Sequence, residues 1–475
     1  MEIEGKYTTA VIHTENIEDA AVQQIQEIVD SPAFENQSVH YMPDVHAGNG
    51  CTVGFTATLG DSINPSHIGG DIGCAVSHMV LTGRIPEEKY ADFEHKVRNA
   101  VPHDIQERPV IDERDFFKYM TTRFNGLRQQ WPERLSGLPI IVTEEWVSEQ
   151  LKRLNMDKAV FYKQLGTYSS AVSNHFIEYG ECGEVSFIDM AWWNRKQKPV
   201  PEGVWTDTEF VDPVPEAYRL TRPFMAGITI HCGSRNFGQK VCRYWQSVSE
   251  NTLSKDDIKQ LKKQFKEEWK RVHWKDKAGY DDALAEYLKK ADSGNTPGYL
   301  TGDNMNGYLC DMCFAQVYAQ YNHYTIQRLI KDILSKYGIR APETVFCPHN
   351  YIDMRDHIIR KGSISAYDTE KVIIPFNMRD GIAVCVGKSN ADWNFSGPHG
   401  AGRAMSRAQA RKNIVLEDYT STMKDVYSTS VCRETIDESP QAYKPTEEIK
   451  KLIEPTVEVM YMLSSRINIK ATKLE

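Results

Sequence analysis

Three widely separated apolar segments of this chain each carry a histidine at one edge, next to another polar residue. The histidines are His175, His231 and His349, and Asn174 and Asn350 are two of the polar neighbours. Taken singly, such a histidine is more often a hydrogen-bonded core residue than a ligand, because short motifs match by chance. The pattern occurs three times, however, and this repetition favours one interior region in which the three imidazoles meet. Such a meeting requires one continuous body.

The apolar spacing elsewhere predicts a single large α+β domain over residues 1–475. Length alone would suggest two or three domains. Residues 15–30 and 304–335 have the spacing of helices, whereas 51–58 and 382–386 are typical of strands. Neither a fixed-period repeat nor a low-complexity linker divides the chain. One body therefore fits the pattern better than a string of domains.

Residues 250–300 differ from the rest of the chain in composition. Ser254 and Asp257 fit a capping box, and apolar residues then continue at helical spacing to Val272. Lysines and glutamates fill the positions between the apolar residues. We expect a charged helical insertion within the domain, with its lysines on a solvated face rather than in a nucleic-acid patch.

The overall charge and the cysteine usage limit the classes of protein to consider. A formal net charge of -9 argues against a protein coated with nucleic acid, although it permits a local basic groove. Residues 1–6 show no secretory signal, and no stretch approaches the roughly 20 apolar residues of a membrane span. Ten scattered cysteines without such a signal predict reduced thiols. We therefore expect a cytoplasmic protein without a membrane partner.

Asp71 and Cys74 add two potential ligands to the three histidines. Glycines surround both residues, so a carboxylate and a potential thiolate lie close together in a tight segment. One cysteine, one aspartate and three histidines make a plausible site for a borderline metal such as Mn²⁺ or Zn²⁺. A thiolate shared between two ions would explain why a single cysteine accompanies so many other ligands.

A glycine-rich stretch also follows His399. The small residues 400–402 allow the backbone to approach a ligand closely and to offer its amides to phosphate oxygens. Arg403 and Arg407 are four residues apart, and both would lie on one face of a helix that began here. The stretch predicts a nucleophile or proton carrier at a phosphate site. The alternative is a glycine-rich turn with a hydrogen-bonded histidine.

Ten short motifs are spread from near the start of the chain to near its end: Pro43–His46, Gly70–Cys74, Gly166–Thr167, Asn174–Glu178, His231–Arg235, Tyr308–Met312, His349–Asn350, Arg360–Gly362, His399–Arg403 and Ala442–Lys444. Together these segments resemble the RNA-splicing ligase RtcB family over essentially the whole chain. The resemblance is weakest in the insertion around 250–300. It implies a single RtcB-like domain with mixed sheets around a central metal and nucleotide cleft.

The resemblance implies a ligase, dependent on GTP and Mn²⁺, that joins an RNA 2′,3′-cyclic phosphate or 3′-phosphate end to a 5′-hydroxyl end. His399 would attack the α-phosphorus of GTP, the guanylate would pass to the RNA 3′-phosphate, and the 5′-hydroxyl would displace GMP. The family analogy places this reaction in tRNA splicing or RNA repair, with an archease-type protein as a possible activator. Of two manganese ions, one would be held by Asp71, Cys74 and His175, and the other by Cys74, His231 and His349.

The same resemblance implies a nucleotide site and RNA contacts. Glu178 or a C-terminal lysine could contact the guanine edge, Tyr443 could stack on the base, and Asp44 could accept the proton of the 5′-hydroxyl. Arg235 and Arg403 are the candidates for RNA phosphates. The residues expected at the nucleotide are Asn174, His175, Phe176, Glu178, His349, Asn350, Pro375, Asn377, Met378, Ile382, His399, Gly400, Ala401, Gly402, Tyr443 and Lys470.

Departures from the family pattern indicate a divergent subgroup. Many relatives have Pro-Gly-Ser-Met-Gly where this chain has 375–379, Pro-Phe-Asn-Met-Arg. Ile382 replaces an expected serine, which predicts one hydrogen bond fewer to the nucleotide. The C-terminal lysine could be Lys470 or Lys473. Two alternative functions remain: a metal-dependent phosphoesterase that only opens cyclic phosphates, and an RNA- or ribosome-binding repair factor with weak ligation.

Overall fold

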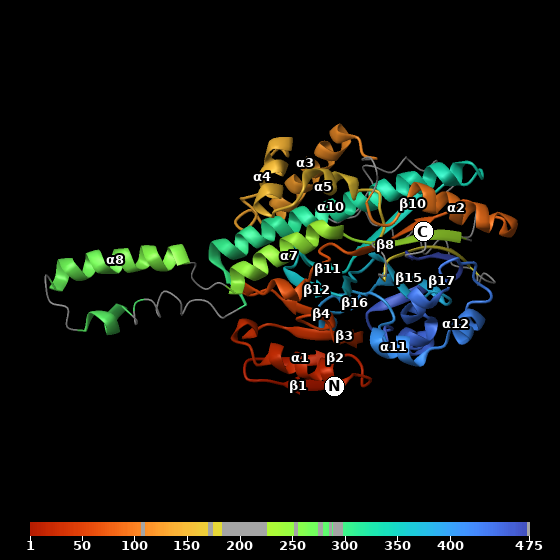
Figure 1. Ribbon diagram of the computed structural model, residues 1–475. Coiled ribbons are helices and arrows are strands. Elements are labelled where there is room, and N and C mark those ends of the chain that lie inside the picture. The colour runs from red at the N-terminus through yellow and green to blue at the C-terminus, as the bar shows by residue number, and fades with distance from the viewer. Residues whose placement is uncertain are drawn as a thin grey trace.

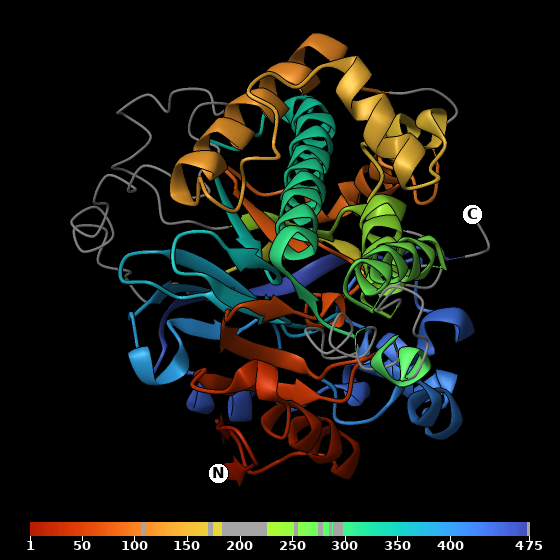
Figure 2. The same ribbon diagram turned by 90° about the vertical axis from the view of Figure 1, so that its left-hand side faces the viewer.

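The protein has the predicted α+β architecture, in which two large sheets and their covering helices form one body (Figures 1 and 2). Among the residues described below, no helix combines the length and the apolar character that crossing a membrane requires. The computed structural model describes residues 1–105, 110–169, 174–182, 226–250, 255–273, 279–284, 287 and 298–472.

The larger sheet has seven strands, and every neighbouring pair is antiparallel. All side chains of β6, β8 and β15 are buried, which is typical of strands covered on both faces. This result confirms the buried strand predicted at 382–386. In spatial order the strands are β10 (Glu343–Pro348), β6 (Ala75–Val80), β8 (Ala226–Cys232), β7 (Phe176–Glu181), β17 (Val457–Ile469), β15 (Gly381–Gly387) and β14 (Lys371–Asn377).

The second sheet has six strands and includes one parallel pair, β2 with β3. The chain passes between these two strands through α1 (Asp19–Val29), so the helix predicted at 15–30 is confirmed as their crossover. In spatial order its strands are β1 (Glu2–Glu4), β2 (Thr9–Ile12), β3 (Val39–His46), β4 (Val53–Thr58), β12 (Ile358–Lys361) and β11 (Asn350–Asp353). Two short pairs are β13 (Ser363–Ser365) with β16 (Ser396–Pro398), and β5 (Ser62–Ile63) with β9 (Leu300–Thr301).

The long helix α10 (Gly302–Ser335) confirms the helix predicted at 304–335 and joins two parts of the core. Its first half packs with the helices around α3 in one apolar cluster, and its second half packs with α2 against the seven-stranded sheet. Figure 2 shows α3 and its neighbours covering α10 on the side away from the N-terminus. The other helices of the body are α2 (Tyr90–Ala100), α3 (Glu113–Gln130), α4 (Glu144–Arg153), α5 (Lys158–Lys163), α7 (Arg235–Glu250), α11 (Arg407–Asn413), α12 (Leu416–Thr422) and α13 (Thr446–Leu452).

One helix stands apart from this body. Figure 1 shows α8 (Lys255–His273) extending away from both sheets and from the other helices. It lies in the segment where the sequence predicts a helical insertion. Ser254, the predicted cap, lies outside the described residues. The ten cysteines are all free, as the sequence predicts.

Candidate functional site

Four candidate ligands lie at adjacent ends of four neighbouring strands in the seven-stranded sheet. Cys74 directly precedes β6, His175 directly precedes β7, His231 lies near the end of β8, and His349 follows β10. Because β10, β6, β8 and β7 are antiparallel neighbours, the start of one strand lies beside the end of the next. His231 is accordingly opposite Phe176 in the register. The strand order therefore brings these four side chains together.

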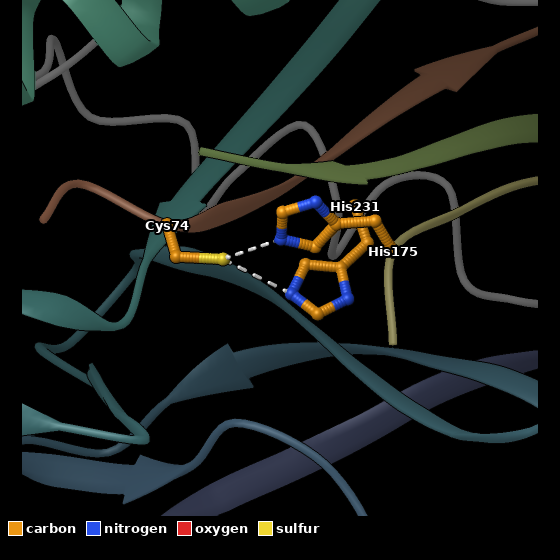
Figure 3. Close-up of side chains that lie close together, drawn as sticks. All are labelled: Cys74, His175 and His231. Atoms are coloured by element: carbon orange, nitrogen blue, oxygen red, sulfur yellow. Dashed lines mark hydrogen bonds between the residues drawn. The ribbon is translucent and has the colours of Figure 1, made fainter. Parts of the chain in front are cut away.

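These residues and Asp71 form a continuous group of contacts, here called the Cys74 cluster. The sulfur of Cys74 lies 3.2 Å from Nε2 of His231 and 3.4 Å from Nε2 of His175 (Figure 3). A carboxylate oxygen of Asp71 lies 2.9 Å from Nε2 of His175, and Nε2 of His231 lies 3.3 Å from Nε2 of His349. Cys74 is at the centre of these contacts. Asp71 and His175 lie on one side of it, and His231 and His349 lie on the other.

The spacing of the donor atoms suits a metal ion. The donor atoms of Cys74, His175 and His231 all lie within 4.8 Å of one another, and all three residues are buried. Two donors bound tetrahedrally to one ion at 2.0–2.3 Å would be roughly 3.6 Å apart, close to the observed separations. Thiolate and imidazole are ligands that borderline transition metals accept. The cluster could hold a metal ion.

Burial sets the protonation of these groups. It lowers the pKa of His231 and of His349, and neighbouring imidazoles lower both further, so these rings are neutral and able to coordinate. Burial, followed by the nearby Asp71 carboxylate, raises the pKa of the Cys74 thiol. A metal ion would supply the positive charge that favours a thiolate there.

His399 lies beside this cluster and is held by Asp44. It follows β16, and its ring centroid is 4.9 Å from that of His349. Nδ1 of His399 lies 2.6 Å from a carboxylate oxygen of the fully buried Asp44, a residue of β3. Gly402 has a φ of +72°, and a Cβ there would lie 2.5 Å from the carbonyl oxygen of Asp44. Glycine is thus required where the segment after His399 packs against β3.

Sequence reasoning expected Asp44 to act on a 5′-hydroxyl and missed its contact with His399. The two residues are far apart in the chain, and only the packing of β16 beside β3 brings them together. A carboxylate on Nδ1 fixes the imidazole tautomer and leaves Nε2 as the free nitrogen. This arrangement suits a nucleophilic histidine.

A second group of side chains, here called the Glu438 cluster, lies next to the ligands. The ammonium group of Lys470 donates to Glu438 at 2.8 Å and to the carbonyl oxygen of Asn174 at 3.4 Å. It also lies 5.4 Å from the centre of the Phe176 ring. The hydroxyl of Tyr443 donates to the same carboxylate at 2.7 Å. The residues on either side of His175 thus connect the two clusters, and the rival Lys473 lies outside the described residues.

Two arginines complete the Glu438 cluster. Arg403 and Arg407 place guanidinium nitrogens 3.4 Å and 3.0 Å from the Glu438 carboxylate. Burial alone would raise the pKa of Glu438, but Lys470, Arg407 and Arg403 together lower it to about 2. Arg403 and Arg407 do not share the face of a helix, because α11 begins only at Arg407. The arginines meet at a carboxylate that sequence reasoning missed, although it lies in the segment just before Tyr443.

Glu178 is buried on β7, next to β17. One of its carboxylate oxygens accepts a hydrogen bond of 2.8 Å from the side chain of Asn468, the residue opposite it in the register. Among the described residues the other oxygen has no hydrogen-bond partner. Burial raises the pKa of Glu178 to about 8. This carboxyl can therefore hold a proton at neutral pH and still accept a further bond.

Backbone contacts join several other expected nucleotide residues. The amide of Ala401 donates to the carbonyl oxygen of Pro375 at 3.1 Å. A Cβ at Gly400 would lie 3.0 Å from that same oxygen. Asn350 donates to the carbonyl oxygen of Asp71 at 3.2 Å and accepts from the amide of Gly362 at 3.0 Å. The segment after His399 is thus fixed against β14, and Asn350 connects the ligand loop to β12.

Three residues in or next to the divergent loop make contacts inside the protein through their side chains. The side-chain oxygen of Asn377 accepts from the amides of Arg379 and Asp380 at 3.0 Å and 2.9 Å, and so forms the turn between β14 and β15. The sulfur of Met378 accepts a bond of 3.1 Å from the hydroxyl of Tyr419. Ile382 is buried in an apolar cluster of the seven-stranded sheet.

Arg235, a candidate for contact with RNA phosphates, lies in the interior of the protein. It is buried, and its guanidinium donates to the hydroxyl of Thr167 at 3.2 Å and to the carbonyl oxygen of Ser169. These bonds hold the start of α7 against the segment after α5. In this structure the guanidinium therefore serves an internal contact rather than an exposed one.

Comparison with known proteins gives a consistent result. The family model described as "tRNA-splicing ligase RtcB" matches residues 24–471. The RNA-splicing ligase RtcB of Escherichia coli (strain K12) is 26% identical over 475 residues, which cover 96% of this chain and 95% of that protein. The tRNA-splicing ligase RtcB of Aeropyrum pernix is 23% identical over 466 residues, which cover 86% of this chain and 83% of that protein.

Proposed function

The chain belongs to the tRNA-splicing ligase RtcB family, and we propose that it joins RNA ends through a guanylylated histidine, His399. The family and the names of the relatives support an RNA ligase role. The substrates would be GTP and RNA with a 2′,3′-cyclic phosphate or 3′-phosphate at one end and a 5′-hydroxyl at the other. The observation that carries the proposal is the position of His399, held by Asp44 at Nδ1 and next to His349 of the Cys74 cluster.

His399 would act as the nucleophile in the first step. With its Nδ1 proton donated to Asp44, its Nε2 lone pair attacks the α-phosphorus of GTP and pyrophosphate leaves. The resulting phosphoramidate transfers the guanylate to an oxygen of the RNA 3′-phosphate, which restores the free imidazole. The RNA 5′-hydroxyl then attacks that phosphate, GMP leaves, and the hydroxyl proton passes to solvent. A 2′,3′-cyclic phosphate end would first be hydrolysed by water to the 3′-phosphate.

The Cys74 cluster would hold Mn²⁺, with Asp71, Cys74 and His175 as one set of ligands and Cys74, His231 and His349 as the other. Bound ions would neutralise the triphosphate and favour departure of pyrophosphate. The protein's own contribution is to fix the ligands at one sheet edge, so that the nucleophile and the ligands keep a constant spacing.

The base of GTP would lie between Glu178 and the Glu438 cluster. Glu178 has an oxygen without a partner among the described residues, and Lys470 is already oriented by Glu438. In its ionised form the Glu178 carboxylate would accept from the guanine N1 and N2 groups, and the Lys470 ammonium would donate to O6. Tyr443 could stack on the base. The turn residue Asn377 and the core residue Ile382 would support the backbone near the nucleotide rather than contact it through their side chains.

Labelling with GTP tests this proposal. The protein is incubated with Mn²⁺ and GTP that carries ³²P at the α-phosphorus, and mass spectrometry locates the added guanylate. We expect acid-labile label on His399, none in His399→Ala, and roughly a hundredfold slower labelling in Asp44→Asn, which lacks the carboxylate that orients the ring. Label on another residue, or no label on a wild-type protein with bound metal, would contradict the mechanism.

A further inference from the structure

The insertion is attached to the body at one narrow neck. The amide of Gly298 donates to the carbonyl oxygen of Ser249 at 3.2 Å, so the chain returns close to the point at which it left. From this neck α8 extends away from both sheets (Figure 1). A helix attached in this way adds little to the core, but it is well placed to contact another molecule.

Five lysines of α8 occupy one face of this helix. Relative to the first, Lys259, the others follow at i+3, i+4, i+7 and i+11, a spacing that aligns side chains along one side of an α-helix. All five are exposed, and Glu267 and Glu268 fall outside their arc. At 1.5 Å per residue the row covers about 16 Å. The five lysines are Lys259, Lys262, Lys263, Lys266 and Lys270.

The aromatic part of the apolar stripe of α8 is covered by the insertion itself, whereas Val272 near its end is 74% exposed. The ring of Phe265 lies 5.5 Å from that of Tyr280 and 5.0 Å from that of Tyr287, and the ring of Trp269 lies 5.6 Å from that of Tyr280. Because these aromatic side chains pack on one another, the stripe is not presented as an open apolar face. The outward character of α8 is therefore cationic, which favours a polyanion over the interior of a lipid bilayer.

We propose that the lysine face of α8 binds the phosphate backbone of a double-stranded RNA stem in the substrate. This inference rests on the proposed function, which makes RNA the substrate. A nucleic-acid duplex carries one charge per roughly 1.7 Å of axis, so a row of about 16 Å faces on the order of ten phosphates. Lysines bind phosphates as point charges and do not identify bases. The face adds affinity that is independent of sequence.

The position of the neck determines which part of the RNA is contacted. α7 has 16 residues, so about 24 Å of helix separates its start, just after the ligand strand β8, from the neck at its end. The lysine face therefore contacts the RNA stem at a distance from the ends being joined. Its loss weakens binding of the whole substrate without altering the chemistry at His399.

Binding of a fluorescein-labelled RNA hairpin with 5′-hydroxyl and 3′-phosphate ends tests the inference, by anisotropy over a range of KCl concentrations. When all five lysines are changed to glutamine, which keeps helix propensity, affinity is expected to fall at least about tenfold at low salt. The slope of log K against log salt should fall by about three. A variant with five arginines should bind like wild type. The matched control changes five exposed lysines of the body to glutamine: Lys6, Lys152, Lys336, Lys424 and Lys451.

Unchanged hairpin binding by the five-glutamine variant, or an equal loss in the matched control, overturns the inference. Phosphatidylserine vesicles are a second probe. If the five-glutamine variant loses vesicle binding but keeps hairpin binding, the face serves a membrane and the inference is also overturned. Labelling of His399 by GTP is measured separately and is expected to be the same in all these proteins. A wild type that binds the hairpin through α8 but never accepts guanylate supports this inference and contradicts the proposed function.

Discussion

The Cys74 cluster and the Glu438 cluster lie side by side, but they accommodate buried polar groups in opposite ways. Around Cys74 the imidazoles are neutral because burial lowers the pKa of His231 and His349. Around Glu438 three cations surround one carboxylate, and the pKa of that carboxylate is lowered to about 2. In the first cluster burial alone would raise the pKa of Asp71, but His175 lowers it, so this half holds a carboxylate that an added cation would complete. In the second cluster the carboxylate is already paired with cations of the protein itself. Metal binding and folding stability should therefore depend on different halves of the site.

The largest expected effect is the loss of metal affinity when Cys74 is replaced, without a matching loss of folding stability. In Cys74→Ser the central donor of the cluster becomes a poor ligand, so metal affinity should fall on the order of a thousandfold, with ligation falling in parallel. The free energy of unfolding of the metal-free protein should change by less than about 1 kcal/mol, because the side chain keeps its size. Chelator competition measures the first quantity and urea unfolding the second.

Cys242→Ser is the matched control for that experiment. Cys242 is also buried, and its sulfur lies 3.9 Å from the carbonyl oxygen of Pro65, to which a serine hydroxyl could donate. This variant should keep its metal. Undiminished metal affinity in Cys74→Ser would remove the basis for the contrast between the clusters.

Replacing the carboxylate of the second cluster should give the reverse result. In Glu438→Gln, the buried Lys470 and Arg403 lose their counter-charge, although Arg407 keeps its ion pair with Asp437. The free energy of unfolding should therefore fall by about 2 to 4 kcal/mol while metal affinity is unchanged. Urea unfolding of the metal-free protein measures this. Adding Lys470→Met to this variant should restore part of the loss, because the two positions are coupled. A Glu438→Gln protein as stable as wild type would show that water, not Glu438, compensates these cations.

The smallest expected effect is a dependence on pH. The folded pKa of Glu438, about 2, lies below its ordinary value of 4.5, so its stabilisation is complete above pH 4.5 and is lost as the pH falls toward 2. Glutamine does not titrate. The stability difference between wild type and Glu438→Gln should therefore shrink by about 2 kcal/mol between pH 6 and pH 3. A constant difference in urea unfolding over this range would assign the effect to packing instead.

The ligands and the buried strands could be predicted from the sequence because each depends on local pattern. His175, His231 and His349 flank or lie in apolar strands, and an antiparallel sheet then needs only neighbouring strands to bring them together. The strand at 382–386 and the helix at 304–335 follow from continuous or periodic burial in the same way.

The partners of these residues could not be predicted, because they depend on contacts between distant loops. Glu438 is the last residue of a short 3-10 helix, η7 (Arg433–Glu438), and nothing in its sequence neighbourhood indicates that Lys470 and Arg403 both reach it. The pairing of Asp44 with His399 likewise depends on β16 lying beside β3. Arg235 is a different case: its place in a site motif made it a candidate for RNA phosphates, and in this structure its guanidinium donates to Thr167 inside the protein.

His349 is the only residue between the end of β10 and the start of β11, so the chain changes sheets at a ligand. An ion bound to this imidazole and to His231 would link the seven-stranded sheet to the six-stranded sheet. A metal ion bound at the Cys74 cluster would then make the packing of the two sheets more rigid, in addition to its role in the reaction. If the centre holds a metal ion, the metal-free protein would be looser and more open to proteolysis.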